Sequence, residues 1–533
     1  MWWQGLLAVT TIYGVKKTID FWQAVQSVGN LPGYRTVINA SGTLVNFLPR
    51  FGVFSPGRNW AFEDKFSSYA AAGIDIIAHV GVYPARGAFF VADPAAVKEI
   101  TTYRSRFPKP VEYYGTLSFF GYNIVASEGE DWKRYRKITA PAFSDRNNRL
   151  VWDETVSIMN DLFDNAWENK KEITIDHCLD LTLPITLFTI SAAGFGHKLS
   201  WKGGHTIPPG HKMTFKDSLY TVTTYIIPRL ALPGWVMSLS KKGKEIVLGF
   251  EELRMHMVEM VETRLKSEKV ERDDLFTSLL NANSDELDGG GLTTDELIGN
   301  IFIFLLAGHE TTAHTLCFTL ALLALYPDEQ EKLYQHIKSV IPDPQAPTYE
   351  QMPLLTQTMA VFNETLRLFP SVTVIPKRSA EDTTLNTTNA QGETVVVPIP
   401  RERTFISTYP PYKLTVRYNI CTGLKAQLIT INCLAKYWED PLEFKPDRFL
   451  KPDWNRDAFL PFSGGPRACL GRKFAETEAV ASLTMLVSRY KISVKEEPQF
   501  AKETVEQRKA RILKTTDLIS LTPVKVPLTF TRR

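Results

Sequence analysis

Residues 462–471 read FSGGPRACLG, a loop sequence that contains Cys469. Two adjacent glycines and a proline predict a rigid loop whose backbone N–H groups can point inward. A helix is predicted to begin near Leu470, and a helix N-terminus stabilises a thiolate. Arg467 adds a positive charge close by. A single cysteine is more often an inert buried thiol. The loop therefore indicates a function only together with motifs elsewhere in the chain.

A long helix is predicted over about residues 294–325, beginning at a capping box that starts with Thr293. It is apolar on nearly all sides and should therefore cross the core. Residues 307–312 (AGHETT) interrupt this pattern, because burying Glu310 is costly unless the carboxylate has partners or is protonated. The glycine allows the helix to open, and Thr311 can bond a freed carbonyl. The segment indicates either a proton-handling groove beside a reaction centre or a kinked helix with a satisfied acid.

Two more motifs carry charges. Glu364 and Arg367 lie three residues apart and share one helix face, which by itself is typical of a surface ion pair. Residues 444–449 (FKPDRF) supply Arg448 shortly before the cysteine loop.

Together these residues resemble the cytochrome P-450 superfamily of haem-thiolate monooxygenases, in the style of microsomal fungal members. The cysteine loop matches the FxxGxRxCxG signature at every fixed position. The AGx(D/E)T(T/S), ExxR and PxRF motifs follow in the family's order, and residues 132–136 (WKRYR) match WxxxR. The resemblance covers about residues 30–525. It implies a mainly α fold with a small β-rich part, in which the long central helix crosses over a buried haem.

The resemblance also implies residue roles. Cys469 would be the axial thiolate on the iron of haem b, and Glu310 and Thr311 would relay protons to the reacting oxygen. A buried charge triad holding the cysteine loop would consist of Glu364, Arg367 and Arg448. The expected haem-binding residues, including those that pair with propionates, are Cys469, Trp132, Arg136, Arg467, Lys377, Phe462, Gly465 and Gly471. The propionate partner could also be Arg378, beside Lys377.

Two residues near the central motif receive no chemical role. His309 stands at a variable position of the motif, so we expect a packing residue rather than a metal ligand. Cys317, two turns further on, is expected in the core. The five cysteines contain no CxxC pair and predict neither a disulfide scaffold nor a structural zinc site.

The length of 533 residues would suggest about three or four domains. The motifs must instead surround one cofactor, so we expect a single haem domain over residues 32–533 and a short membrane-associated segment over residues 1–31. The hydrophobic share of 44% supports a large core, and the net charge of +3 argues against a nucleic-acid binder. We expect a monomer.

The apolar run from Trp2 to Val15 is shorter than the roughly 20 residues of a membrane-spanning helix. Its paired tryptophans suit a membrane interface, and a buried N-terminal helix is the alternative. The resemblance implies a catalytic domain on the cytoplasmic face of the endoplasmic reticulum, with electrons from NADPH through cytochrome P-450 reductase. A basic docking face, or simply a solvated charged face, would comprise Lys133, Arg134, Lys137, Arg472 and Lys473.

The reaction implied is insertion of one oxygen atom from O2 into a lipophilic small molecule, by hydroxylation or epoxidation. Candidate pocket residues are Phe119, Phe120, Tyr122, Ile303, Phe304, Ala307, Thr312, Val372 and Val374. They suit a lipophilic substrate, although any core contains such residues. The resemblance to fungal family members implies a terpenoid, a fatty acid or a xenobiotic as substrate, and a role in secondary metabolism. A haem-thiolate isomerase or dehydratase, which typically lacks the acid–threonine pair, and an inactive haem-binding protein are the alternatives.

One segment departs from the family pattern. Between residues 393–400 (ETVVVPIP) and 436–438 (KYW), the chain has additional residues at about 403–427. Removing them joins VPIPRE to LITINCLAKYW, which reads like the family. The segment is either a surface insertion, which loops tolerate, or translation of an unremoved intervening sequence; we favour the second. Cys421 lies within it and receives no functional role.

Overall fold

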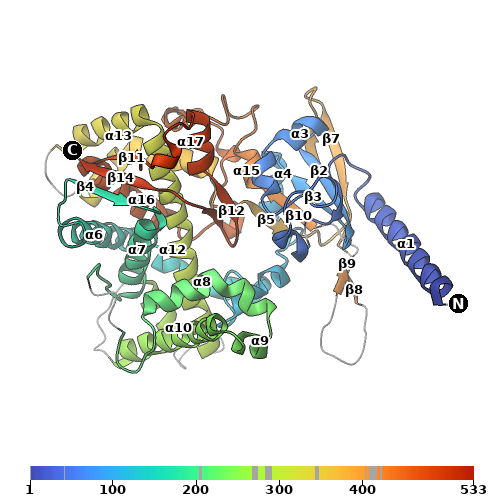
Figure 1. Ribbon diagram of the computed structural model, residues 1–533, viewed down its shortest axis with the longest axis horizontal. Coiled ribbons are helices and arrows are strands. Elements are labelled where there is room, and N and C mark those ends of the chain that lie inside the picture. Colours follow the sequence, from blue (N-terminus) through green and yellow to red (C-terminus); the bar gives the residue numbers. More distant parts are fainter. Residues whose placement is uncertain are drawn as a thin grey trace.

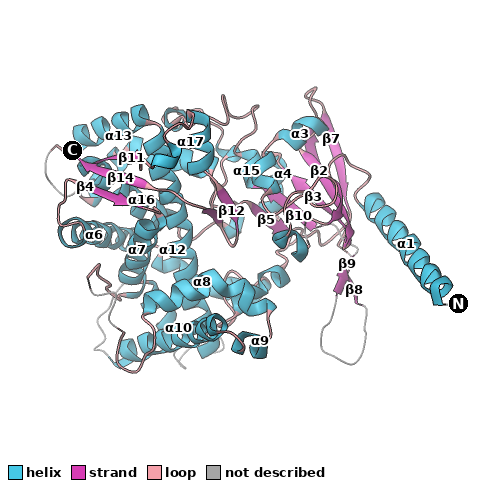
Figure 2. Ribbon diagram, viewed as in Figure 1, coloured by secondary structure: helices cyan, strands magenta, loops and turns pink. Residues whose placement is uncertain are grey.

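The computed structural model describes residues 2–40, 42–202, 207–266, 274–282, 291–342, 347–402, 404–406, 417–419 and 423–533. Helices form most of the molecule, and the larger strands gather on the side from which the N-terminal helix extends (Figures 1 and 2). The mainly α fold with a small β-rich part, predicted from the sequence, is confirmed.

The central helix, α12 (Thr294–Leu325), begins with the predicted capping box. The Thr293 hydroxyl accepts from the Glu296 N–H at 3.3 Å, and the Glu296 carboxylate accepts from the Thr293 N–H at 2.9 Å. Among the described residues, α12 is the one helix long and apolar enough to cross a membrane, but 72% of its apolar window is buried inside the protein. It is therefore a core helix, and it runs unbroken through Gly308.

The helices around α12 carry the predicted motifs. It packs against α7 (Leu179–Thr189), α14 (Thr356–Leu368) and α16 (Arg472–Arg489), and against β11 (Tyr490–Val494). The WxxxR motif lies on α5 (Gly129–Thr139), the Glu364 motif on α14, and the cysteine loop directly precedes α16.

A five-stranded sheet has the order β1 (Arg35–Ile38), β2 (Ile76–Tyr83), β3 (Ala85–Val91), β10 (Gly423–Gln427), β5 (Val374–Lys377). Strands β2 and β3 follow each other directly in the chain and form an antiparallel hairpin. Strand β10 pairs in parallel with β3 and antiparallel with β5.

The position of β10 corrects the expected extent of the additional segment. Residues 423–427 were assigned to its end, yet they form an interior strand that joins β3 to β5. Before them, β8 (Thr404–Ile406) pairs antiparallel with β9 (Arg417–Asn419). The rest of the segment, including Cys421, lies outside the described residues. A surface insertion would therefore have to end before β10.

The first helix, α1 (Trp2–Ser27), extends away from the body (Figure 1). Trp2 and Trp3 are largely exposed, whereas Ala24 and Val25 are buried against the sheet. Burial therefore applies only to the end of this helix, and the alternative of a buried N-terminal helix is wrong for most of its length.

The remaining elements complete the body. The helices are α2 (Trp60–Asp64), α3 (Ser67–Ala72), α4 (Pro94–Thr102), α6 (Asp145–Asp161), α8 (Phe215–Ala231), α9 (Gly234–Ser238), α10 (Lys241–Lys266), α11 (Leu275–Asn281), α13 (Pro327–Val340), α15 (Leu428–Ile431) and α17 (Val505–Ile512). The strands are β4 (Glu172–Ile175), β6 (Thr383–Thr388), β7 (Thr394–Ile399), β12 (Thr515–Asp517), β13 (Leu521–Pro523) and β14 (Leu528–Arg532).

Candidate active site

A cavity of about 380 Å³ lies between the central helix and the cysteine loop. Its wall comes from segments far apart in the sequence: α4, α5, α12, α14, β5, the cysteine loop and α16. Cys469 and Thr311 both line it, so the fold brings the cysteine loop and the hydroxyl-bearing turn of α12 to one space.

The cysteine loop is held in a defined shape. The Cys469 N–H donates to the Phe462 carbonyl at 2.9 Å, and both residues line the cavity, as does Gly471. Gly465 has φ +65°, and a Cβ there would lie 2.3 Å from the Thr101 carbonyl oxygen. Only glycine fits this position, because it tolerates both the left-handed backbone and the close approach of α4. Gly465 therefore shapes the loop without itself lining the cavity.

The Cys469 thiol opens into the cavity from the start of α16. Burial raises its pKa, while a hydrogen bond from the Gly471 N–H and the charge of Arg136 act in the opposite direction. A soft sulfur ligand on a rigid loop, with N–H groups and a cation around it, suits a thiolate that binds a metal ion.

One end of the cavity is cationic. The guanidinium groups of Arg104 and Arg467 lie 4.4 and 4.6 Å from the centroid of the Trp132 ring. Arg136 donates to the Ala468 carbonyl at 3.1 Å, which ties α5 to the cysteine loop. Trp132, Arg136 and Arg467 all line the cavity.

Two lysines add to this charge. Lys377 donates to the Phe107 carbonyl at 3.1 Å, and burial with the nearby Arg467 lowers its pKa to about 8. Burial lowers the pKa of Lys109 to about 7. In the part of the chain that the structure describes, Glu128 is the one carboxylate paired here, and it binds Arg467 at 3.1 Å. Positive charge therefore exceeds negative charge, and an anionic group bound here would stabilise the cluster.

Sequence reasoning missed Lys109 and Tyr114, which also line this end. Lys109 stands between two prolines in residues 107–110 (FPKP), and no spacing rule links it to the recognised motifs. Arg378, the alternative to Lys377, instead pairs with Glu112 at 2.5 Å and does not line the cavity.

The cavity fits a haem. Its lining is mostly apolar, one cysteine sulfur opens into it, and its cationic end suits two propionates. Arg467 Nε is buried and has no hydrogen-bond partner among the described residues, so the cluster still has a donor to offer.

Glu310 and Thr311 face different surroundings although they are adjacent. Thr311 lines the cavity and its hydroxyl donates to the Ala307 carbonyl at 2.9 Å. Glu310 does not line the cavity; it accepts from the Ser520 hydroxyl at 3.1 Å, and burial raises its pKa to about 7. Ser520 in turn contacts His314 Nδ1 at 2.9 Å. Glu310 thus lies behind the cavity wall and contacts the Ser520 hydroxyl, which sequence reasoning did not identify.

His309 and Cys317 have the packing positions expected of them. His309 is buried, and its Nδ1 contacts the Leu305 carbonyl at 2.8 Å. Burial lowers its pKa to about 4, so it is neutral. Cys317 is buried in the core, as are Cys178 and Cys433.

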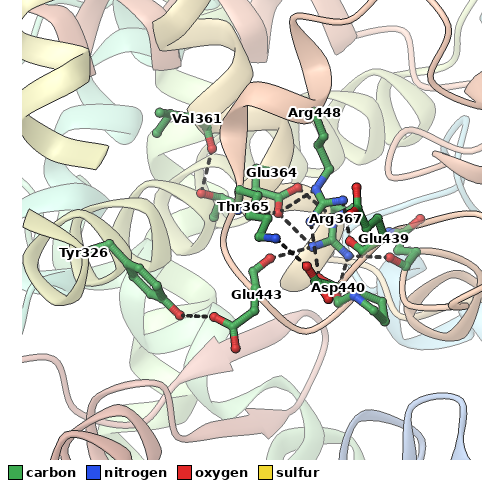
Figure 3. A network of polar contacts seen from close by, with 12 residues as sticks. Tyr326, Val361, Glu364, Thr365, Arg367, Glu439, Asp440, Glu443 and Arg448 are labelled. Carbon is green, nitrogen blue, oxygen red and sulfur yellow. Dashed lines mark hydrogen bonds and ion pairs between the residues drawn. The ribbon is translucent and has the colours of Figure 1, made fainter. Parts of the chain in front are cut away.

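The predicted charge triad is present (Figure 3). Arg367 donates to both oxygens of Glu364, at 2.7 and 2.8 Å, and both side chains are fully buried. Arg448 donates to Glu364 at 3.1 Å. Arg367 also donates to backbone carbonyls of residues 432, 441 and 443, and Arg448 to that of Glu439. The triad therefore fixes the chain that leads into the cysteine loop, and it does not line the cavity.

Most of the predicted pocket residues line the cavity, namely Ile303, Phe304, Ala307, Thr312, Val372 and Val374. Phe119 and Phe120 do not line it. Both rings pack on Phe250 of α10, with centroids 4.6 and 5.9 Å away, because an aromatic cluster between α10 and α12 holds them. Tyr122 is largely exposed.

The predicted basic face is partly neutralised. Arg134 binds Glu296 at 2.5 Å and so ties α5 to the start of α12. Lys133 pairs with Glu130 at 2.6 Å, and Arg472 with Glu476 at 2.8 Å. Lys137 and Lys473 are exposed.

Comparisons with known proteins show the family to which the chain belongs. The family model "Cytochrome P450" matches residues 80–401 and 418–522, leaving out part of the additional segment. The chain is 49% identical to Cytochrome P450 monooxygenase 124 of Postia placenta over 531 residues, 99% of this chain and 98% of that protein. It is 27% identical to Secologanin synthase 2 of Catharanthus roseus over 76% of this chain and 73% of that protein. The fold resembles a solved cytochrome P450DA heme domain with a TM-score of 0.71 at 20% identity, covering 94% of this chain and 98% of that one. The chain therefore belongs to the cytochrome P450 family and is a monooxygenase of that family.

Proposed function

We propose that this monooxygenase binds haem b through Cys469 and inserts one oxygen atom from O2 into a lipophilic small molecule, by hydroxylation or epoxidation. Electrons come from NADPH through a reductase. The observation that carries the proposal is the shared cavity: Cys469 lines it from one side, and the apolar face of α12 with Thr311 lines it from the other.

The chain's own residues would hold the cofactor. Cys469 would ligate the iron, and haem ligated by a thiolate supplies the chemistry that activates oxygen. Trp132, Arg136, Arg467 and Lys377 would bind the propionates, with Lys109 as a further cation. Each ion pair would relieve the cost of burying positive charge without a partner.

Thr311 and Glu310 would handle protons. The Thr311 hydroxyl points along the cavity wall and can exchange a proton with a water or substrate group there. Glu310, with a pKa raised to about 7 by burial, holds or releases a proton near neutral pH. Since Glu310 faces Ser520, its proton would reach the cavity only after its side chain turns or through water.

The substrate would contact Ile303, Phe304, Val372 and Val374, which present apolar surface to the cavity. Such a lining excludes water and favours a lipophilic molecule. A role in fungal secondary metabolism is consistent with the relative in Postia placenta.

The exposed part of α1 would lie in the surface of the endoplasmic reticulum membrane, with a monomeric catalytic domain in the cytoplasm. Its tryptophans suit the interface between headgroups and acyl chains. The exposed Lys137 and Lys473 would contribute to reductase docking.

A reduced, CO-bound absorption spectrum tests the ligand. We expect the Soret band of thiolate-ligated haem in the wild type and its loss in Cys469→Ala. Cys433→Ala, which removes a buried thiol elsewhere, should retain it. Retention of the band in Cys469→Ala would refute the assignment. Incubation with NADPH, a reductase, 18O2 and a panel of lipophilic compounds should then yield products carrying one labelled atom. Turnover without label would favour the isomerase alternative.

A further inference from the structure

Far from the haem cavity, two histidines and a glutamate converge beside α10. His211 precedes α8, while Glu252 and His256 lie one turn apart on α10. One ligand atom from each lies within 4.8 Å of the others. We propose that His211, Glu252 and His256 form a binding site for Zn2+.

One of the two histidines is already oriented as a ligand. His256 Nε2 contacts the Met213 carbonyl at 3.1 Å, so this nitrogen carries the proton and Nδ1 presents its lone pair. A second ring nitrogen fixed by a backbone carbonyl is typical of histidines that ligate zinc. His256 and Glu252 are both buried, which limits their motion.

His211 lies between two carboxylates. Its Nδ1 is 2.9 Å from Glu252 and its Nε2 is 2.9 Å from the exposed Glu259. Two imidazole nitrogens and one or two carboxylate oxygens are a ligand set that Zn2+ accepts. The set contains no cysteine, so the cysteine pattern of the sequence did not reveal it.

The two imidazole rings stack, with centroids 3.7 Å apart and planes 3° from parallel. A metal ion lies in the plane of each ring that ligates it, so binding requires His211 to turn out of this stack. His211 lies on the segment before α8, outside α10 itself. The bound ion would hold the segment that precedes α8 against α10. Helices α8 and α10 pack side by side (Figure 1).

Zinc K-edge X-ray absorption of the wild-type holoenzyme, after dialysis against Zn2+, tests the site without any variant. We expect one zinc per chain, ligated by two imidazoles and oxygen at about 2.0–2.1 Å. Sulfur ligands at about 2.3 Å, or less than stoichiometric zinc, would overturn the proposal and leave the cluster as an ion-pair clamp.

Calorimetric titration with Zn2+ locates the ion. His256→Ala and Glu252→Gln should each weaken binding at least tenfold, whereas His336→Ala on α13 should not. The CO-bound spectrum should be unchanged in all of them, which separates this site from the haem site. Binding that persists at wild-type strength in folded His256→Ala would refute the assignment.

Discussion

The Ser520 hydroxyl donates a hydrogen bond to Glu310 Oε1 at 3.1 Å, joining the segment between β12 and β13 to the middle of the central helix. Burial raises the pKa of Glu310 to about 7, and the bond from Ser520 lowers it. The C-terminal part of the chain therefore adjusts the acidity of a carboxyl on α12.

This arrangement predicts a pH dependence. If protonated Glu310 donates during turnover, the rate should fall as the pH rises through about 7, where the carboxyl ionises. Glu310→Gln should remove this inflection, and Ser520→Ala should move it to higher pH, because a bond that favours the ionised form is lost. Initial rates from pH 5.5 to 9 would show this, with Ser339→Ala on α13 as control. An unchanged profile in Ser520→Ala would contradict it.

The same carboxyl makes stability depend on pH. Its pKa is higher in the folded chain than the ordinary value of 4.5, so the folded state binds more protons between the two values. The contribution of Glu310 to the free energy of unfolding should therefore fall as the pH rises from 4.5 to about 7. Glu310→Gln lacks this contribution. Its unfolding free energy, measured with urea, should therefore fall less across this range than that of the wild type. Equal slopes for both proteins would count against the raised pKa.

Removing one member of the charge triad should be severe. Arg367→Ala leaves the fully buried Glu364 without its bidentate partner, which should cost about 3–5 kcal/mol of unfolding free energy. Lys242→Ala, which removes a surface pair with Glu245, should change stability little. Urea unfolding of the holoprotein measures both. Similar losses in the two variants would show that the triad is not a special support.

Gly465→Ala tests the contact between the cysteine loop and α4. Gly392 also has positive φ (+80°), but a Cβ there meets nothing within 4 Å. Gly392→Ala should cost about 1 kcal/mol from backbone strain alone, and Gly465→Ala distinctly more, because its Cβ would displace the Thr101 carbonyl. The thiolate Soret band should weaken only in Gly465→Ala. Equal effects in the two variants would mean that the contact has no role.

Lys377→Met should stabilise the apoprotein but weaken haem retention in the holoprotein. In the apoprotein, removing a cation whose pKa burial lowers to about 8 should stabilise the fold by about 1–3 kcal/mol. In the holoprotein, losing a charge-assisted bond of about 1.5–3 kcal/mol should speed haem loss to a scavenger roughly 10- to 100-fold. Lys473→Met, at an exposed position on α16, should change neither quantity. The same sign in both states would exclude Lys377 as a propionate partner.

The sequence predicted local features well. Capping chemistry placed the start of α12 at Thr293, and the apolar pattern on all its sides identified a core helix. The glycines and cysteine of residues 462–471 identified a loop that lines the cavity, because their spacing lies within one segment. These features depend on neighbours in the chain, which the sequence displays directly.

Tertiary placement was less predictable. Phe119 and Phe120 look like pocket residues, but Phe250 on α10 holds them elsewhere. Lys109 reaches the cationic end of the cavity only through the fold. Glu310 turns toward Ser520, 210 residues away, because that hydroxyl offers a bond to a buried acid. Each outcome depends on a contact between distant segments that no local pattern contains.

The hydrogen bond from Arg136 to the Ala468 carbonyl joins residues 332 positions apart. At a synthesis rate of about 5–20 residues per second, a ribosome needs roughly 20–70 s to make the chain between them. Throughout that time the α5 segment has emerged without the loop that completes its surroundings. The nascent chain therefore spends most of its synthesis with apolar surface of the future cavity uncovered. The yield of folded enzyme should accordingly depend on how well chaperones protect this surface during translation.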